Sequence, residues 1–240
     1  MNNMNQNGRS MIEMLGVLAI IGVLSVGGIA GYSKAMLKYK TNKLIDQVTM
    51  LTTNIRTLYA QQKTFTGLDG IAGSVTAYDN GKTAIEMGVI PDEMIRKTTN
   101  ATDPTKTDTD LKNPFAGTII LDVDNSVPGD AGENRAFIIG VNGIPKEACM
   151  AVAVSDWGSN YSSGLIGMAI SNATNVYTKL QAAKNATAGT AGVIVAGNCT
   201  SKNETTSAAY CAKDLPIQVA EASAACNCNG SSCSVAFKYY

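Results

Sequence analysis

The chain has 240 residues, of which 45% are hydrophobic, so it is long and apolar enough to bury a core. Basic and acidic side chains balance to a formal net charge of zero, which argues against binding nucleic acid through a basic surface. Histidine is absent, which excludes Ser/His/Asp and Cys/His hydrolases. The composition therefore predicts neither an enzyme nor a need for a cofactor.

The N-terminal residues divide into a short polar stretch and a long apolar one. Residues 1–8 (MNNMNQNG) are polar and aperiodic, and we interpret them as a leader peptide. The chain is almost wholly apolar from Met11 to Tyr32, and the 20 residues from Met14 to Ser33 carry no charge. A helix of that length crosses the hydrocarbon of a bilayer. Residues 9–33 are therefore predicted to be a transmembrane helix or, alternatively, part of a signal peptide.

The helix is predicted to continue beyond this span. No proline occurs before Pro91, and the glycines give way to residues of high helix propensity. Residues of one stripe recur at alternating four- and three-residue steps and are apolar except for Thr41: Leu37, Thr41, Leu44, Val48, Leu51, Ile55 and Leu58. The pattern predicts one helix from about Ser10 to about Gln62, whose second half, residues 34–62, lays an apolar face on a globular domain.

Residues 63–240 are predicted to form that domain, with an α+β fold and an antiparallel sheet. The segment 82–97 (KTAIEMGVIPDEMIRK) indicates a short helix that is broken at Pro91 and then resumes. Gly117–Val123 and Arg135–Val141 are predicted to pair as a hairpin. A further helix is expected to start near Pro145, because proline is favoured in a first helical turn.

The C-terminal third is harder to interpret until its last residues. Residues 171–213 have poor periodicity, although 191–197 (AGVIVAG) indicates a strand. In Ser234–Tyr240 an alternation of Val235, Phe237 and Tyr239 with smaller or polar residues predicts a half-buried final strand.

Six cysteines indicate an oxidising compartment. They are Cys149, Cys199, Cys211, Cys226, Cys228 and Cys233. An even number crowded into a loop-rich region favours disulfides, and Cys226, Cys228 and Cys233 as a soft-metal site are the weaker alternative because the paired spacing of zinc sites is missing. Asp122, Asp124, Asn125 and Asp130 could bind calcium, but they lack the spacing of an EF-hand loop and are interpreted as a solvated acidic turn.

Glu13 is the only charged residue between Met11 and Ser33. Placing a carboxylate in hydrocarbon costs on the order of 2.5–3.5 kcal/mol on insertion scales. Either Glu13 reaches the membrane interface, where the cost is small, or it awaits a positive partner from another subunit.

The residues around Glu13 resemble the leader junction of type IV prepilins and pseudopilins. The resemblance rests on Gly8-Arg9-Ser10-Met11-Ile12-Glu13-Met14-Leu15 and the apolar run that follows. It implies that a prepilin peptidase cuts after Gly8 and methylates the new amino group of Arg9, although the family usually has Phe or Met at that position. It also implies that this cation pairs with Glu13 of a neighbouring subunit, since an unpaired ion is disfavoured in an apolar bundle.

The same resemblance implies the partners and the location of the chain. Expected partners are identical subunits in a helical homopolymer, the prepilin peptidase, an inner-membrane platform, an assembly ATPase and an outer-membrane secretin. No nucleic acid is expected, because the charges of the chain balance. The subunit is expected in the inner membrane with a periplasmic domain before assembly, and in an extracellular pilus for adhesion, conjugation or motility afterwards.

The charges that flank the span conflict with this topology. The leader lacks Lys and Arg, while Lys34, Lys38, Lys40 and Lys43 follow the span. The positive-inside rule alone would place the C-terminal domain in the cytoplasm. The cysteines and the pilin resemblance place it on the oxidising side, which we adopt.

Three further segments resemble the type IVb pilins, most of all the conjugative thin-pilus branch. They are 88–95 (GVIPDEMI), 113–119 (NPFAGTI) and 144–149 (IPKEAC). That resemblance implies a bridge from Cys149 to Cys226 or Cys228. Cys199 with Cys211 is a local hypothesis, since six cysteines allow 15 pairings.

Two other functions compete with a pilus subunit. A pseudopilin of a type II secretion system shares the leader junction. A membrane-tethered binding protein would use the apolar run only as a signal or anchor, but it would leave the amphipathic continuation after Lys34 unexplained.

Overall fold

A single helix, α1 (Asn7–Tyr59), forms the N-terminal quarter of the computed structural model, close to the range predicted. The structure describes residues 7–72, 74–75, 80–99, 107–125, 134–158, 163–172, 199, 201–203, 207–228 and 232–240. The chain forms two units, Met1–Lys40 and Thr41–Tyr240, and α1 contributes to both. We call the second the globular unit.

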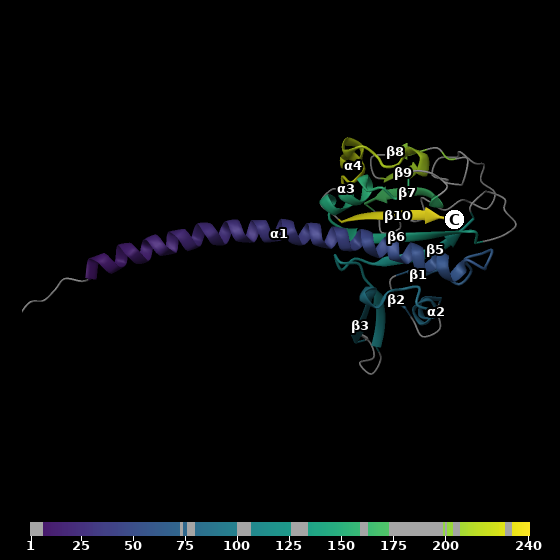
Figure 1. The fold of residues 1–240 in the computed structure, drawn as a ribbon, viewed down its shortest axis with the longest axis horizontal. Coiled ribbons are helices and arrows are strands. Elements are labelled where there is room, and N and C mark those ends of the chain that lie inside the picture. The colour runs from purple at the N-terminus through teal and green to yellow at the C-terminus, as the bar shows by residue number, and fades with distance from the viewer. Residues whose placement is uncertain are drawn as a thin grey trace, which may run out of the picture. The chain divides into compact units, whose positions relative to one another are not determined.

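The globular unit is built on a seven-stranded antiparallel sheet, which confirms the predicted α+β class (Figure 1). Its strand order is β1-β5-β6-β10-β7-β9-β8. In that order the strands are Ile71–Ala72, Ile119–Asp124, Ala136–Ile144, Cys233–Tyr239, Leu165–Ser171, Ser207–Cys211 and Lys202–Asn203. The predicted hairpin is confirmed as β5 and β6, which pair from Ile119↔Val141 to Asp124↔Ala136.

The helix predicted over residues 82–97 is wrong in its second half, which belongs to a smaller sheet. Here α2 (Asn80–Glu86) is followed by one 3₁₀ turn, η1 (Asp92–Met94), and then by β3 (Ile95–Thr99). The helix does not resume as predicted, because the β-branched residues of β3 pair with β4 (Thr107–Leu111), which also pairs with β2 (Ser74–Val75). The buried side chain of Met94 anchors the turn.

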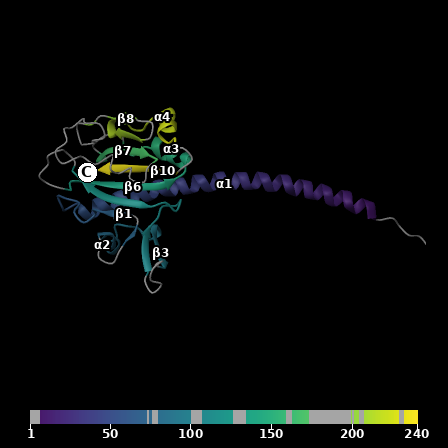
Figure 2. The same cartoon turned by 180° about the vertical axis from the view of Figure 1, so that it is seen from behind.

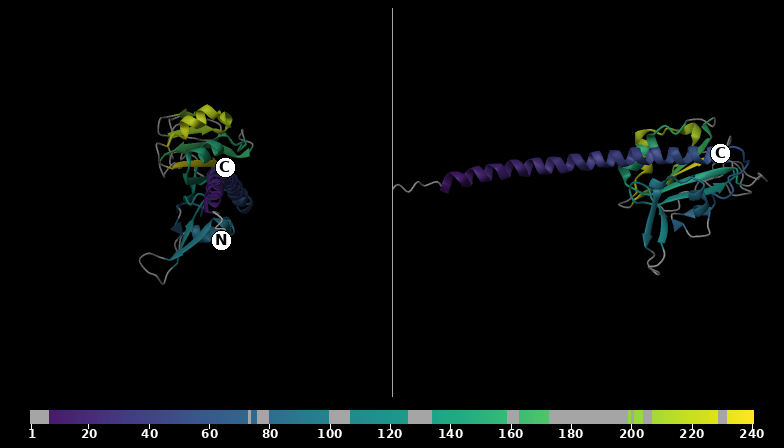
Figure 3. Two further views of the ribbon diagram at one scale, coloured as in Figure 1. Left: turned by 90° about the vertical axis from the view of Figure 1, so that its left-hand side faces the viewer. Right: turned by 60° about the horizontal axis from the view of Figure 1, so that its bottom comes forward.

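Helices cover one face of the larger sheet. The C-terminal part of α1 crosses this face (Figure 3), and α3 (Lys146–Val154) begins after Pro145 as predicted. In the described part of the chain, the remaining helical elements are η4 (Ala212–Asp214) and α4 (Val219–Ala225). Because side chains alternate along a strand, Phe137, Phe237 and Tyr239 all point toward α1 and α3.

The half-buried pattern predicted for the last strand is wrong. Every residue of β10 is buried, including Lys238. The reason is position: β10 lies in the middle of the sheet, between β6 and β7, as Figure 2 shows from behind. Its second face carries small residues, such as Ala236, that pack with Ala169 and Ile138 in an apolar cluster.

Sequence reasoning missed β7 and β9, and the strand predicted at 191–197 lies outside the described residues. β9 (SAAYC) is rich in alanine, which has low strand propensity. It is a strand because it pairs along its length with β7, from Gly167↔Cys211 to Ser171↔Ser207.

Candidate functional site: the N-terminal helix and its base

The first part of α1 presents an apolar surface with no covering. We call residues 11–33 the apolar segment. Every large apolar side chain from Met11 to Ile29 is between 53% and 76% exposed. This is the one stretch among the described helices that is long and apolar enough to cross a membrane. Near its end the Ser33 hydroxyl donates to the Ile29 carbonyl oxygen at 3.0 Å, so that this polar group is satisfied within the helix.

The three residues of the predicted leader junction lie in the first turns of α1. The backbone is helical through Gly8 and Arg9, and the side chain of Arg9 lies outside the described part of the chain. Glu13 is exposed and one turn beyond Arg9. Arg9 and Glu13 are four residues apart and so share one face of the helix. In a parallel helix of another chain, shifted along the axis by about one turn, position 9 would lie level with Glu13.

The second part of α1 buries the predicted stripe against the sheet. Leu44, Val48, Leu51 and Ile55 are almost completely buried, and Thr41 is buried with them. At the end of the stripe Leu58 is only half-buried, and Tyr59 takes the core position instead. Burying such aliphatic side chains contributes about 1.5–3 kcal/mol each. This part of the helix is therefore held firmly on the sheet of the globular unit.

A closed chain of aromatic contacts holds the end of α1 on the sheet. The Tyr59 ring lies 5.6 Å from that of Phe65, which lies 4.8 Å from that of Phe137. Phe137 on β6 is stacked on Tyr239 of β10 at 5.4 Å. The guanidinium carbon of Arg56 lies 5.2 Å from the centre of the Tyr239 ring, which returns the chain of contacts to α1.

Burial raises the pKa of Tyr239 to about 12, although its hydrogen bond with Thr52 and the Arg56 charge both favour the phenolate. The tyrosine is therefore a neutral packing residue at any physiological pH. Space at this point is limited: a Cβ added to Gly164 would lie 2.0 Å from a terminal nitrogen of Arg56, and Gly164 has a positive φ of 75°.

A second group of contacts, which is polar, links α1 to η1 and to the residues just before it. Glu93 in η1 accepts a hydrogen bond from the Gln47 amide at 2.8 Å, and its other oxygen lies 3.1 Å from the Lys43 ammonium. The Asn54 amide donates to the Val89 carbonyl oxygen at 3.1 Å. The Gln47 hydrogen bond is the largest cause of the lowered pKa of Glu93; burial opposes it, and the Lys43 ammonium lowers the pKa further.

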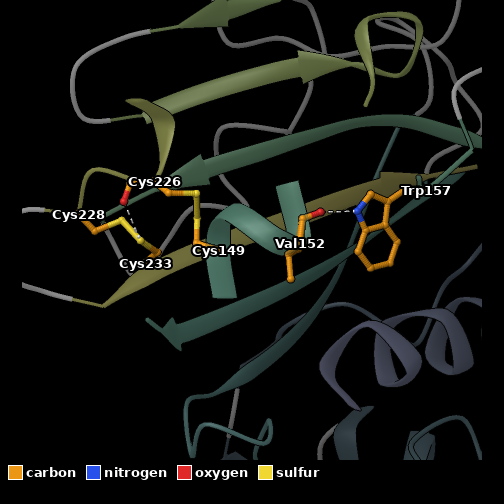
Figure 4. The surroundings of a disulfide bond; sticks show 6 residues. All are labelled: Cys149, Val152, Trp157, Cys226, Cys228 and Cys233. Atoms are coloured by element: carbon orange, nitrogen blue, oxygen red, sulfur yellow. Dashed lines mark hydrogen bonds between the residues drawn. A yellow bond between two sulfur atoms is a disulfide. The ribbon is translucent and has the colours of Figure 1, made fainter. Parts of the chain in front are cut away.

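All six cysteines form disulfides. One of these bonds joins the end of α4 to α3, and a second lies beside it (Figure 4). Cys149 on α3 is bonded to Cys226 at the end of α4, a separation of 77 residues. Cys228 is bonded to Cys233, the first residue of β10, and Cys199 to Cys211 on β9. The weaker alternative of a metal at Cys226, Cys228 and Cys233 is therefore wrong.

The two C-terminal disulfides stack against one another beside α3. The Cys233 sulfur lies 3.5 Å from the Cys226 carbonyl oxygen, a contact rather than a hydrogen bond because a disulfide sulfur has no proton. After α3, the Trp157 indole donates to the Val152 carbonyl oxygen at 2.8 Å, and its ring lies 4.4 Å from that of Phe237 (Figure 4). The start of β10 is fastened covalently and its middle by aromatic packing.

A buried ion pair crosses the other face of the sheet. The Lys238 ammonium lies 2.6 Å from an Asp124 oxygen, with side chains 0% and 9% exposed. Burial lowers the pKa of Lys238, against the opposing effect of Asp124. Burial also raises the pKa of neighbouring Asp122. A solvated acidic turn is therefore the wrong interpretation for Asp124, and Asp130 lies outside the described residues; no potential metal cluster occurs among those described.

Sequence reasoning missed Lys238, Glu93 and Gln47 as structural residues. Lys238 occupies a polar position of an alternating strand, where exposure is the normal expectation, and its partner is 114 residues away. Gln47 lies beside the apolar stripe at one turn from Leu44 and Leu51, which was the available signal that it is buried.

Comparison with known proteins places this arrangement among pilus subunits. The bundlin family model matches residues 34–206. The chain is 26% identical over 178 residues to the major structural subunit of bundle-forming pilus from Escherichia coli O111:H-, covering 73% of this chain and 77% of the relative. The same values hold for that subunit from Escherichia coli O127:H6 (strain E2348/69 / EPEC).

Two solved structures are also similar. A type IV b pilin from Salmonella typhi is 20% identical with a TM-score of 0.43, covering 82% of this chain and 97% of that structure. TcpA, a type IV pilin from Vibrio cholerae El Tor biotype, is 15% identical with a TM-score of 0.46, covering 84% and 99%. The family match begins at Lys34, so Gly8, Arg9 and Glu13 precede it and their roles stay predictions.

Proposed function

The chain belongs to the bundlin family of type IV pilins, and on that premise we propose that it is a structural subunit of a type IV pilus, processed after Gly8 and polymerised through α1. The family relatives are structural subunits, which confirms that the chain is not an enzyme. The carrying observation is the apolar segment, which is exposed along its whole length on a chain whose globular unit is otherwise well packed.

The exposure of this segment requires a partner. Exposed apolar surface of this extent is not stable in water, and its neutral length matches the thickness of a bilayer core. Two partners satisfy the same surface in turn: lipid before assembly and the apolar segments of other subunits afterwards. The segment therefore serves first as an inner-membrane anchor and then as the core of an extracellular filament.

Glu13 sets the position of each subunit in that filament. Cleavage after Gly8 removes the polar leader, residues 1–8, and leaves the methylated amino group of Arg9 as a cation. This cation pairs with the Glu13 carboxylate of a subunit already in the filament, because neither charge is stable alone among apolar helices. Arg9 and Glu13 are one helical turn apart in each chain. When Arg9 of one subunit pairs with Glu13 of the next, the two subunits are therefore shifted along the filament axis by about one turn.

The globular unit faces the periplasm before assembly and the outside afterwards. Three disulfides support this placement, since such bonds persist in oxidising compartments. Assembly uses the prepilin peptidase, an inner-membrane platform, an assembly ATPase and an outer-membrane secretin. The filament then acts in adhesion, conjugation or motility.

Intact-mass and N-terminal peptide analysis of protein sheared from its own cells, without reductant, tests this proposal. We expect a chain that starts at a methylated Arg9 and is lighter by six hydrogens than the reduced form, because three disulfides are present. A chain that starts at Met1, or one cut beyond Ala30, would contradict pilin processing and favour a tethered or secreted binding protein.

A further inference from the structure

The residues directly after the apolar segment have the chemistry of a membrane surface. The 20 uncharged residues from Met14 to Ser33 rise by about 30 Å as a helix, which is the thickness of the hydrocarbon core. Lys34 then stands at the level of the headgroups, and Lys38 lies about 6 Å further along the axis, still within that layer.

Two pairs of exposed side chains share this level. Tyr32 and Tyr39 are 65% and 62% exposed and, being seven residues apart, lie on one side of α1. Lys34 and Lys38 are exposed and four residues apart, on a different side of the helix from the tyrosines. We call these four residues the interfacial band. All of them belong to the unit Met1–Lys40.

The lysines of the band have no acidic partner in their own part of the chain. After Glu13 the next acidic residue in the sequence is Asp46. Among the described residues, neither Lys34 nor Lys38 has a carboxylate within ion-pair distance, whereas Lys43, nine residues beyond Lys34, is paired with Glu93. A cationic pair at headgroup depth, with two tyrosines at the same level, complements an anionic lipid surface.

We propose that the interfacial band binds anionic phospholipid headgroups in the leaflet from which the globular unit emerges, and so retains the subunit in the membrane before assembly. The inference rests on the proposed insertion of the apolar segment. It gives the lysines that contradict the positive-inside rule a local role, since their charge then acts on lipid after export rather than on orientation. A subunit that enters the filament must release these headgroups, so the anionic lipid content controls how readily it leaves the membrane.

The full chain reconstituted in bilayers of mixed phosphatidylglycerol and phosphatidylcholine provides the test. Electron spin resonance of spin-labelled lipids measures the fraction of each lipid that the protein immobilises, and hence the preference for phosphatidylglycerol. We expect a preference in the wild type that falls by up to about fivefold for each lysine replaced in Lys34→Gln/Lys38→Gln, and that weakens with added salt.

Two matched variants complete the design. Lys34→Arg/Lys38→Arg keeps the charges and is expected to keep the preference. Lys146→Gln/Lys213→Gln removes the same charge from exposed positions of the globular unit and is expected to change nothing. Immobilised lipid without any preference, or equal losses in both glutamine variants, would overturn the inference while leaving membrane insertion intact. Absence of immobilised lipid of either kind would overturn insertion itself, and with it the proposed anchor.

Discussion

The two ends of α1 are both rich in apolar residues, but their surroundings are opposite. From Met11 to Ile29 every large apolar side chain is exposed, whereas from Leu44 to Ile55 the stripe is buried against the sheet. The second part carries its apolar residues on one face and is satisfied inside its own chain. The first part is apolar on all faces and can be satisfied only by lipid or by other helices. One continuous helix thus has two roles: its second part packs against the sheet of its own chain, and its first part provides the surface proposed for assembly.

Replacement of Glu13 is expected to have the largest effect, and only on assembly. Glu13→Ala leaves the amino-terminal cation of an incoming subunit unpaired among apolar helices, which costs on the order of 3–5 kcal/mol per subunit. Filament yield from sheared cells should fall at least a hundredfold, while the Tm of the globular unit stays unchanged. Partial recovery in Glu13→Asp is the expected control, and normal filaments from Glu13→Ala would remove Glu13 from the assembly mechanism.

The disulfides should stabilise the globular unit more when they close longer loops, with a gain that grows as the logarithm of loop length. Cys149→Ser/Cys226→Ser removes a link across 77 residues and is expected to cost about 4.5 kcal/mol in the chain-entropy model, against about 2 kcal/mol for Cys228→Ser/Cys233→Ser, whose link spans 5. Denaturant unfolding of the full chain in detergent measures both, with fluorescence of the single tryptophan, Trp157, as the probe. Equal losses in the two variants would contradict the entropic account.

Removal of Lys238 tests whether the centre of the sheet depends on its ion pair. Lys238→Met leaves the Asp124 carboxylate without its ammonium in a nearly dry site, and we expect a loss of about 3–5 kcal/mol in the free energy of unfolding. In the double variant Lys238→Met/Asp124→Leu most of that stability should return, because no buried charge is left without its counter-ion. A double variant as unstable as the single one would contradict the account in which the loss comes from an uncompensated Asp124 charge.

A matched pair of leucines tests the comparison directly. Leu51 is buried on the sheet and Leu24 is exposed in the apolar segment. Leu51→Ala should lower the free energy of unfolding by about 2–5 kcal/mol through the cavity that it creates. Leu24→Ala should leave that value within about 0.5 kcal/mol of wild type. A similar loss from both substitutions in detergent would mean that the two parts of α1 are not independent.

Glu93 should produce the smallest effect, visible in acid. Its carboxyl has a lowered pKa in the folded protein, so its contribution to stability is complete above its unfolded pKa and is lost as pH falls through the folded value. The contribution is at most about 1 kcal/mol because the pair with Lys43 is partly exposed. Glu93→Gln should therefore flatten the fall in Tm below the ordinary glutamate range, and an unchanged acid profile would contradict this.

Local sequence patterns were enough to predict several elements of this fold. The length of α1, its change from apolar to amphipathic, the β5–β6 hairpin and the start of α3 after Pro145 all followed from residues close together in the chain. The isolated charge of Glu13 and the six cysteines also pointed to export and assembly without any coordinates. Such features are accessible because helix and strand periods repeat within a few residues.

Features that depend on pairing between distant residues could be read only from the folded chain. β10 has the alternation of a half-exposed strand, yet its place between β6 and β7 buries both faces and sends Lys238 to Asp124. Ile95–Thr99 continues a helical pattern, yet pairing with β4 makes it a strand. The choice of Cys226 rather than Cys228 as the partner of Cys149 was likewise open until α3 and α4 were placed. In each case the energy comes from neighbours that are remote in sequence, so no local pattern encodes the outcome.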